Sequence, residues 1–381
     1  KCMRILIGSN VHWWNAEAAY AAKIAFLLKD AGHIVHVITQ PKSTNEKNLK
    51  KLGLSLVTDV DLNTKNPYRL FISYKRLKKL IREEEIELIN PHQSEGFPLF
   101  LLAAGLFKSS FSQKPIPVVR TRGTTRPIKK HWLNMKMHTK WTNYFITAGN
   151  VVKKRLQKNV DIPNAIVETI YYPVESPILP LQPIRNYRKE FDIKKKSTVF
   201  AVVGRIRPIK GQRILLRIFC QLLSDFPDLI LLIIYRDTSD SEPEMKKLRR
   251  EIIRMGIESS LRLIPEREDI LQLMEFVDVG IVSSIESEVI CRVAVEFFSV
   301  GTPVVAFPTG CLPEIIRDGE NGFLAKSQKK EELLKKLKIF LKNPDLIKKM
   351  GKAARQDAEI RFNPKKMLKE TLKVYKLFKK K

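Results

Sequence analysis

The chain has 381 residues, of which 44% are hydrophobic, and a formal net charge of +29 at pH 7. This length and apolar share are typical of a globular protein with two domains. The charge predicts an anionic partner, namely nucleic acid, an anionic membrane surface or an acidic substrate, although a general lysine bias on exposed helices explains part of it equally well.

Four cysteines stand at positions 2, 220, 291 and 311 and form no C-x-x-C pair. This spacing argues against a disulfide framework or a zinc site and favours a reducing compartment. No apolar run approaches the ~20 residues that a bilayer-spanning helix needs. The first residues show no signal-peptide pattern. We therefore expect a cytoplasmic protein.

The first half of the sequence opens with a strand at 4–8, a helix at 15–31 and a strand at 34–39, as a doubly wound sheet does. Further strands are expected at 86–89, 116–120, 144–147 and 167–170, and helices at 70–81, 96–107 and 151–156. Loops that follow parallel strands meet at the ligand-binding edge of such a sheet. Asn15 lies in the first of these loops, and His92 follows the strand at 86–89.

Cations gather where the strand at 116–120 ends. They are Arg120, Arg122, Arg126, Lys129 and Lys130. A guanidinium cannot act as a base, but it binds carboxylates and phosphates through two parallel hydrogen bonds. These side chains are therefore candidates for binding an anionic ligand. Residues 128–141 then interleave bases with Trp132 and Trp141, which is typical of a basic membrane-surface helix; a core-facing helix with a basic outer face is the alternative.

Prolines at 177, 180 and 183 indicate a linker before the second half. A strand at 198–203 then leads into the loop GRIRPIKG, residues 204–211, and a helix at 212–223. Arg205 and Lys210 in this loop can neutralise a diphosphate as its leaving charge grows. A basic surface turn is the alternative, and the Glu motif described next makes it the weaker one. The other expected elements are strands at 229–234, 262–264 and 278–283 and helices at 242–255, 269–276, 329–340, 345–361 and 365–381.

The segment 281–324 predicts a strand, a loop, a helix at 289–300 and a strand at 304–307. Glu288 precedes this helix and Glu296 lies on it, with seven residues between them. Two carboxylates at this spacing can reach different parts of a long ligand, while the free N–H groups of the first helical turn meet a diphosphate between them. Two solvated helix charges are the simpler explanation of the pair alone.

The loop 204–211 and the E-x7-E segment with its following GTPVVAFPTG together resemble the donor-binding signature of the retaining GT-B glycosyltransferases, glycosyltransferase family 4 (group 1). The resemblance implies an α/β protein of the GT-B class, with two Rossmann-like doubly wound domains and a cleft between them. It implies an acceptor-binding domain at 1–175, a linker at 176–196, a donor-binding domain at 197–363 and a helix at 364–381 that crosses back to the first domain.

The resemblance also assigns roles to residues. Glu288, Arg205 and Lys210 are the expected catalytic residues, with Glu288 on the transferred sugar and Glu296 on the ribose. The full donor set is Gly204, Arg205, Lys210, Glu288, Val289, Ile290, Cys291 and Glu296; the acceptor set is Asn15, His92, Arg120, Arg122, Arg126 and Lys129. The family usually has Gly-Phe-Gly directly after the first Glu, where this chain has Val-Ile-Cys. The resemblance implies no metal, because GT-B enzymes generally need none, and no cofactor, because the nucleotide-diphosphate sugar is a co-substrate.

The expected function is transfer of a sugar, with retention of configuration, from a nucleotide-diphosphate sugar to an anionic glycolipid or saccharide acceptor. The most specific form of this hypothesis is lipopolysaccharide-core or other cell-surface glycan synthesis at the inner face of the cytoplasmic membrane, with peripheral attachment to the anionic lipid surface. Nucleic acid is an unlikely partner on this interpretation. The alternatives are a sugar-nucleotide epimerase of the same fold and a non-catalytic polyanion-binding protein.

Overall fold

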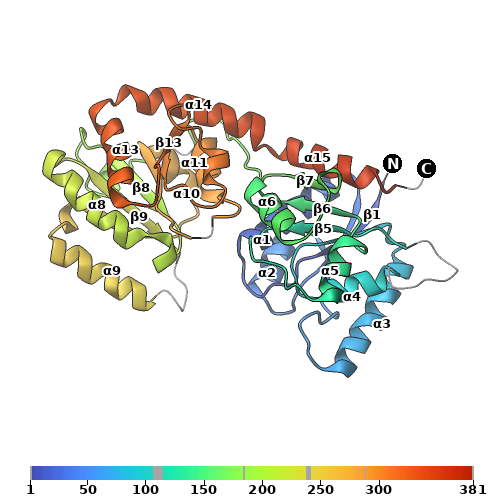
Figure 1. Ribbon diagram of the computed structural model, residues 1–381. Coiled ribbons are helices and arrows are strands. Elements are labelled where there is room, and N and C mark those ends of the chain that lie inside the picture. Colours follow the sequence, from blue (N-terminus) through green and yellow to red (C-terminus); the bar gives the residue numbers. More distant parts are fainter. Residues whose placement is uncertain (1, 106–114, 183–184, 237–241, 287, 380–381) are drawn as a thin grey trace. The chain divides into compact units, whose positions relative to one another are not determined.

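The computed structural model describes residues 2–105, 115–182, 185–236, 242–286 and 288–379. The chain divides into two compact units (Figure 1). Unit 1 consists of Lys1–Tyr172 and Pro364–Lys381, and unit 2 of Pro173–Asn363. Each unit is built of parallel strands and helices.

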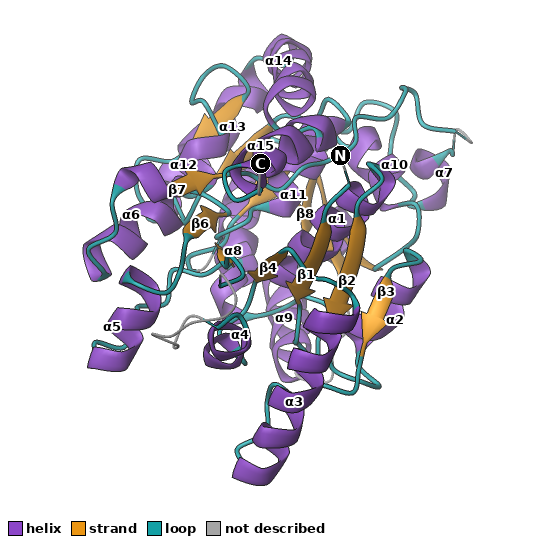
Figure 2. Ribbon diagram, turned by 90° about the vertical axis from the view of Figure 1, so that its right-hand side faces the viewer, coloured by secondary structure: helices purple, strands orange, loops and turns teal. Residues whose placement is uncertain are grey.

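Unit 1 is built on parallel strands (Figure 2). Four of them form a sheet in the order β3-β2-β1-β4, and three form a sheet in the order β5-β6-β7. A bridge between Ile89 and Val118 connects the two sheets. The strands are β1 (Arg4–Gly8), β2 (Ile34–Ile38), β3 (Ser55–Val57), β4 (Leu88–Pro91), β5 (Val119–Arg122), β6 (Tyr144–Thr147) and β7 (Val167–Thr169).

The helices of unit 1 are α1 (Ala16–Asp30), α2 (Thr44–Lys51), α3 (Pro67–Glu83), α4 (Phe97–Ala103), α5 (Trp132–Thr139), α6 (Asn150–Asn159) and α15 (Pro364–Lys376), with a 3-10 turn at Asn164–Ile166. The apolar faces of α3, α4 and α5 share one core cluster, which includes Leu77, Phe100 and Met137. The last helix, α15, buries Tyr375 completely, and the hydroxyl of this tyrosine donates to Asn90 Oδ1 at 2.8 Å.

Unit 2 has one parallel sheet of six strands in the order β10-β9-β8-β11-β12-β13. Numbered within the unit, this order is 3-2-1-4-5-6, the arrangement of dinucleotide-binding sheets. The strands are β8 (Val199–Val203), β9 (Ile230–Tyr235), β10 (Leu261–Pro265), β11 (Val279–Val282), β12 (Val304–Ala306) and β13 (Gly322–Leu324). The order reverses between β8 and β11, so the loops after these two strands lie next to each other.

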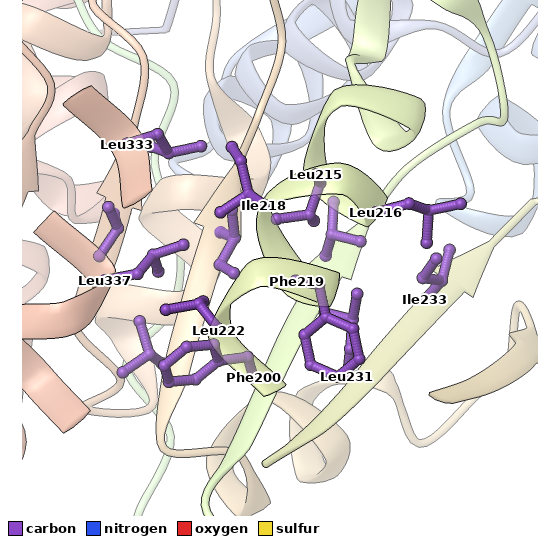
Figure 3. Packing of buried hydrophobic residues seen from close by; sticks show 14 of the residues in the cluster. Phe200, Leu215, Leu216, Ile218, Phe219, Leu222, Leu231, Ile233, Leu333 and Leu337 are labelled. Carbon is purple, nitrogen blue, oxygen red and sulfur yellow. The ribbon is translucent and has the colours of Figure 1, made fainter. Parts of the chain in front are cut away.

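The helices of unit 2 are α7 (Tyr187–Glu190), α8 (Gln212–Asp225), α9 (Glu242–Met255), α10 (Ile270–Phe276), α11 (Arg292–Ser299), α12 (Leu312–Ile315), α13 (Lys330–Lys342) and α14 (Asp345–Arg361), with 3-10 turns at Pro208–Lys210 and Glu258–Ser260. Figure 3 shows how α8 packs on the sheet: Phe219 and Leu222 lie among Phe200 and Leu231, and Leu337 of α13 closes the cluster. This core fixes the start of α8, and with it the loop at 204–211.

Three expectations differ from the structure. The strand expected at 116–120 is Val119–Arg122, so Arg122 lies within the strand rather than in the loop after it, and Arg120 lies inside the strand rather than at its end. The helix expected at 289–300 begins only at Arg292, because Cys291 has a left-handed backbone with φ +49°. Residues 185–193, expected in a linker, fold against unit 2, where Tyr187 is buried and its hydroxyl donates to Asp269 Oδ2 at 2.9 Å.

Some expectations concern residues outside those that the structure describes: Pro183, the end of the helix at 96–107 and the last two residues of the helix at 365–381. The elements α2, β3 and β13 were not predicted from the sequence. These elements are short, and their residues alone show too weak a periodicity to distinguish them from loops.

Candidate functional site

The switch point of the unit 2 sheet brings together the two loops that the sequence singled out. Residues 204–211 follow β8, and residues 283–291 follow β11, the neighbouring strand. In open α/β sheets, ligands bind outside the carboxyl ends of the strands at this point.

Lys210 and Glu288 form an ion pair across the two loops. The hydroxyl of Ser284 donates to the same carboxylate oxygen, Glu288 Oε1, at 2.6 Å. The Lys210 and Glu288 side chains are 24% and 12% exposed, so the pair is partly shielded from water. An anionic ligand that enters here can replace Glu288 as the partner of Lys210, and this exchange frees the carboxylate to accept from a ligand hydroxyl.

Backbone contacts hold the two loops against each other. The Ser283 hydroxyl donates to the Lys210 carbonyl at 2.8 Å, and the Ile285 N–H donates to the Ile209 carbonyl at 3.0 Å. Gly211 permits this approach because a Cβ there would lie 2.0 Å from the Ser283 carbonyl oxygen. The position of Lys210 relative to Glu288 is therefore set by main-chain packing.

The loop after β12 contacts the main chain of Glu288. The Cys311 N–H donates to the Glu288 carbonyl at 2.7 Å. A Cβ on Gly310 would lie 1.9 Å from this same carbonyl oxygen, and Gly310 has φ +59°. The loop after β12 thus sets the main-chain position of Glu288.

A pocket opens at this place. Its lining includes the ends of β8 and β11, the Lys210–Glu288 pair and the start of α11. The lining residues are Val202, Val203, Lys210, Gln212, Ile281, Val282, Ser283, Ser284, Glu288, Cys291, Val293, Ala294 and Leu312. Both expected catalytic charges of the pair therefore face a concave surface.

Glu296 lies on α11, one turn after Arg292. Its Oε1 is 2.8 Å from Arg292 Nε, and its side chain is 19% exposed. Burial raises the pKa of this carboxyl, while Arg292 lowers it. Glu296 is not among the residues that line the pocket, whereas Lys210 and Glu288 both line it.

The remaining members of the expected donor set lie on the same loops. Gly204 is half-buried and Arg205 is exposed, and the Arg205 carbonyl accepts from Gln212 Nε2 at 2.8 Å. Val289 is half-buried. Ile290 and Cys291 are buried.

Cys291 stands where the resembling family has the second glycine of Gly-Phe-Gly. It takes φ +49°, a left-handed backbone that glycine adopts at little cost. Its thiol donates to the Glu288 carbonyl at 3.2 Å. At this position the chain thus adopts a left-handed turn with a residue other than glycine.

In unit 1 the cation cluster divides into buried and exposed members. Arg120 is 3% exposed, hydrogen-bonds to His138 and Ser94, and lies 3.8 Å from the centre of the Phe97 ring. Burial lowers the pKa of its guanidinium well below the usual value. These contacts indicate that Arg120 orders the core of unit 1, which corrects the expectation of a cluster that follows the strand.

Arg122 is also buried, at 5% exposed, and donates to the Arg126 carbonyl at 2.9 Å. Arg126 and Lys129 are exposed. Arg122 thus orders the segment that carries Arg126, and Arg126 presents its charge to solvent.

His92 and Asn15 both have structural contacts. His92 is buried, its Nε2 lies 2.9 Å from Asn90 Oδ1, and burial lowers its pKa to about 3, so the ring is neutral at pH 7. Asn15 caps α1, and its Oδ1 accepts from the Ala18 N–H at 2.8 Å. The Asn15 contact is the usual one for an N-cap residue.

Three polar residues near the switch point of unit 1, namely Asn10, Gln93 and Glu17, were not identified from the sequence. Asn10 and Gln93 follow β1 and β4, and the Asn10 N–H donates to Gln93 Oε1 at 3.1 Å. Both side chains are buried. Within the described chain, neither side-chain amide nitrogen, Asn10 Nδ2 or Gln93 Nε2, has a hydrogen-bond partner. Burial raises the pKa of Glu17, Glu95 raises it further, and Arg122 lowers it. Their place directly after two adjacent strands is the signal that could have identified Asn10 and Gln93.

Across the described ranges, His, Cys, Asp and Glu side chains nowhere gather in a group of three that could hold a metal ion. None of the described helices has both the length and the apolarity needed to cross a membrane.

Residues 18–176 match the model of the family Glycosyltransferase Family 4, and residues 183–357 match Glycosyl transferases group 1. Among curated proteins, the chain is 29% identical over 178 residues to a D-inositol 3-phosphate glycosyltransferase of Streptomyces coelicolor. That match covers 45% of this chain and only 39% of the relative.

Solved structures resemble the chain over nearly its whole length. A glycosyltransferase from Rickettsia africae has a TM-score of 0.88 at 20% identity and covers 99% of this chain and 98% of its own. Anabaena HepE in complex with UDP-glucose has a TM-score of 0.81 at 19% identity and covers 98% and 100%. The expected fold class is confirmed. The chain therefore has the GT-B fold, with a region that matches Glycosyltransferase Family 4 followed by a region that matches Glycosyl transferases group 1.

Proposed function

We propose that this protein transfers a sugar, with retention of configuration, from a nucleotide-diphosphate sugar to an anionic acceptor. The observation that carries the proposal is the Lys210–Glu288 pair in a pocket at the switch point of unit 2. At this place a cation suits the diphosphate of the donor, and a carboxylate suits the hydroxyl groups of its sugar. HepE, a structural neighbour, was solved with UDP-glucose, so uridine donors are the first to test.

Each residue of the site has a distinct role in this proposal. Lys210 and Arg205 neutralise the diphosphate, whose negative charge grows as the sugar leaves. Glu288 accepts from a hydroxyl of the transferred sugar once Lys210 has turned to the phosphate. Glu296 accepts from the ribose. Retention and the absence of a metal requirement follow the resemblance of these two loops to the family signature. A single-turnover product with inverted anomeric configuration, or loss of transfer on addition of a chelator, would contradict them.

The donor proposal is tested by thermal unfolding with uridine, guanosine and adenosine diphosphates and their sugars. A donor at 100 times its dissociation constant should raise the unfolding free energy by about 2.7 kcal/mol. Glu296→Ala should weaken the effect of nucleotide and nucleotide-sugar alike, because the ribose is common to both. The matched control is Glu359→Ala on α14, since Glu359 pairs with Arg355 four residues before it, as Glu296 does with Arg292.

Two results would refute this assignment. If no donor shifts the unfolding temperature while salt-sensitive binding to nucleic acid is strong, the protein is a polyanion-binding protein that has kept the fold. If Glu296→Ala and Glu359→Ala respond to donors equally, the ribose does not lie at Glu296.

For the acceptor we propose an anion bound on unit 1, most specifically the lipopolysaccharide core or another acidic glycolipid presented at the cytoplasmic face of the membrane. Arg122 and the exposed Arg126 support an anion at the end of β5, and the unpartnered amide nitrogens of Asn10 and Gln93 suit a polyhydroxylated ligand. The Streptomyces relative is named for a phosphorylated compound, D-inositol 3-phosphate, which is consistent with an anionic acceptor.

Arg126→Gln should raise the KM for a phosphorylated sugar acceptor several-fold and leave the KM for the donor unchanged. The variant removes one exposed charge. It leaves the hydrogen bond from Arg122 in place, because Arg122 donates to the backbone carbonyl of Arg126 and not to its side chain. Arg155→Gln, an exposed arginine on α6, is the control. Steady-state transfer to matched phosphorylated and unphosphorylated sugars provides the measurement. The acceptor assignment must be abandoned if Arg126→Gln weakens the donor and leaves the charged acceptor untouched.

A further inference from the structure

Four aromatic side chains stand out from the surface of unit 1. Trp13, Tyr68, Phe71 and Trp132 are 67%, 72%, 51% and 63% exposed. Among the described residues, these are the large aromatic side chains that are exposed, and all four belong to unit 1. Such side chains are normally buried for most of their area, so their gathering in one unit needs a reason.

The topology places all four at one edge of the unit. Trp13 lies in the loop after β1, Tyr68 and Phe71 in the first turns of α3, which follows β3, and Trp132 at the start of α5, which follows β5. All strands of unit 1 are parallel, so these positions lie at the carboxyl edge of its strands. Figure 2 shows α3 extending beyond the arrowheads of β1 and β2. Asn10 and Gln93 follow β1 and β4 at the same edge, and Arg122 ends β5 there.

The outer face of α3 is strongly basic. Its inner face buries Ser73, Leu77 and Ile81. The helix carries six basic side chains, Arg69, Lys75, Arg76, Lys78, Lys79 and Arg82, against one acidic side chain, Glu83. Buried residues recur every fourth position, which leaves Tyr68, Lys75 and Lys79 on the opposite side of the helix.

Cations also lie directly over the aromatic rings. Lys75 Nζ is 4.6 Å from the centre of the Phe71 ring, and Lys136 Nζ is 5.0 Å from that of Trp132. On α5 the residues Leu133 and Met137 pack into the core, so Trp132 is the aromatic side chain of this helix that remains outside. The expectation that the whole segment from Trp132 to Trp141 presents an aromatic face is thus narrowed to Trp132, since Trp141 also packs against the core.

We infer that the carboxyl edge of unit 1 docks on an anionic lipid bilayer, with Tyr68, Phe71 and Trp132 entering the headgroup layer and the lysines of α3 pairing with lipid phosphates. Aromatic rings flanked by long basic side chains suit this interface, where one end of the side chain is apolar and the other is wet. Two cations of α3 have carboxylate neighbours, Arg76 with Asp59 and Lys79 with Glu83, and the net positive charge that remains on the helix complements an anionic surface. The inference deepens the proposed function, because the candidate acceptor site at Asn10, Gln93 and Arg122 then faces the membrane that presents the acceptor.

The test is co-sedimentation of the full chain with vesicles of phosphatidylglycerol and phosphatidylcholine. Tyr68→Ser combined with Phe71→Ser should lower the partition coefficient by about tenfold or more. Lys75→Gln combined with Lys79→Gln should lower it by about fivefold for each lysine at low salt, and less at high salt. Vesicles of phosphatidylcholine alone should bind the wild-type protein weakly.

Matched controls remove similar groups elsewhere. Ile253→Ser combined with Ile360→Ser removes two exposed apolar side chains of unit 2, and Lys348→Gln combined with Lys352→Gln removes two exposed lysines of α14. Both should bind vesicles as the wild type does. Equal losses in the controls, or unchanged binding of the α3 variants, would overturn the inference. Binding that depends on α3 but is specific for RNA, or a change from dimer to monomer in the α3 variants with vesicle binding intact, would also overturn it.

Thermal stabilisation of the α3 variants by donors distinguishes failure of the docking proposal from failure of the donor-site proposal. It should equal that of the wild type, because α3 lies in unit 1 and the candidate donor site in unit 2. A protein that binds vesicles through α3 yet responds to no nucleotide sugar would refute the donor assignment and leave the docking surface standing.

Discussion

Lys210→Ala is expected to lower turnover on the order of 10²-fold or more, with a smaller effect on donor affinity. Lys210 is the cation of the switch-point pocket that contacts Glu288. Its charge matters most when the diphosphate departs, because negative charge then accumulates on the leaving oxygen. Loss of an interaction that strengthens in the transition state lowers the turnover number more than it raises KM. Transfer rates under saturating donor, compared with single-turnover rates, measure this difference.

The control for this prediction is Lys336→Ala. Lys336 is a partly buried lysine of unit 2, 14% exposed, and its Nζ lies 2.8 Å from Asp318 Oδ2. Its replacement removes a lysine–carboxylate pair of the same kind at a place away from the pocket, so it should affect stability alone. If Lys336→Ala slows transfer as much as Lys210→Ala does, the loss reflects general destabilisation. Full activity of Lys210→Ala at limiting donor would refute the site.

Gly310→Ala is expected to abolish most donor-dependent stabilisation although no side chain of the site is changed. The added Cβ would lie 1.9 Å from the Glu288 carbonyl oxygen, and two backbone segments cannot both stay in place at that distance. The loop that carries Glu288 must move, and with it the carboxylate that pairs with Lys210. We expect turnover to fall on the order of 10²-fold, as it does when catalytic groups are displaced by about 1 Å. Donor thermal shifts and transfer rates provide the measurement.

Gly319→Ala separates this clash from backbone strain. Gly319 has φ +86°, like Gly310 a left-handed conformation, but a Cβ there would meet nothing within 4 Å. Both variants should lose about 1 kcal/mol of unfolding free energy from the strained backbone. Only Gly310→Ala should lose donor binding and turnover as well. Equal donor responses in the two variants would show that the position of Glu288 does not depend on the contact with Gly310.

Much of the fold could be predicted from the sequence because its periodicities are strong. The strands β1 and β6 and the helices α9 and α14 have the expected limits. Long amphipathic helices and buried apolar strands carry a clear signal in their own residues. The limits of β5 were wrong, because two of its four buried residues, Arg120 and Arg122, are arginines rather than apolar residues. Burial of Arg120 depends on His138, Ser94 and Phe97, which stand 18, 26 and 23 positions away in the sequence.

By itself the sequence determined which residues are candidates for the donor loops, since GRIRPIKG and the E-x7-E segment are local patterns of residue type and spacing. Tertiary structure alone decided how they meet. The order of β8 and β11 places Lys210 against Glu288 across 78 positions of sequence, and Gly211 and Gly310 leave room for the loops to touch. The tertiary structure also decided which cations of unit 1 face solvent and which helices carry the exposed aromatic side chains. Burial and strand order depend on contacts between distant segments, which spacing along the chain does not encode.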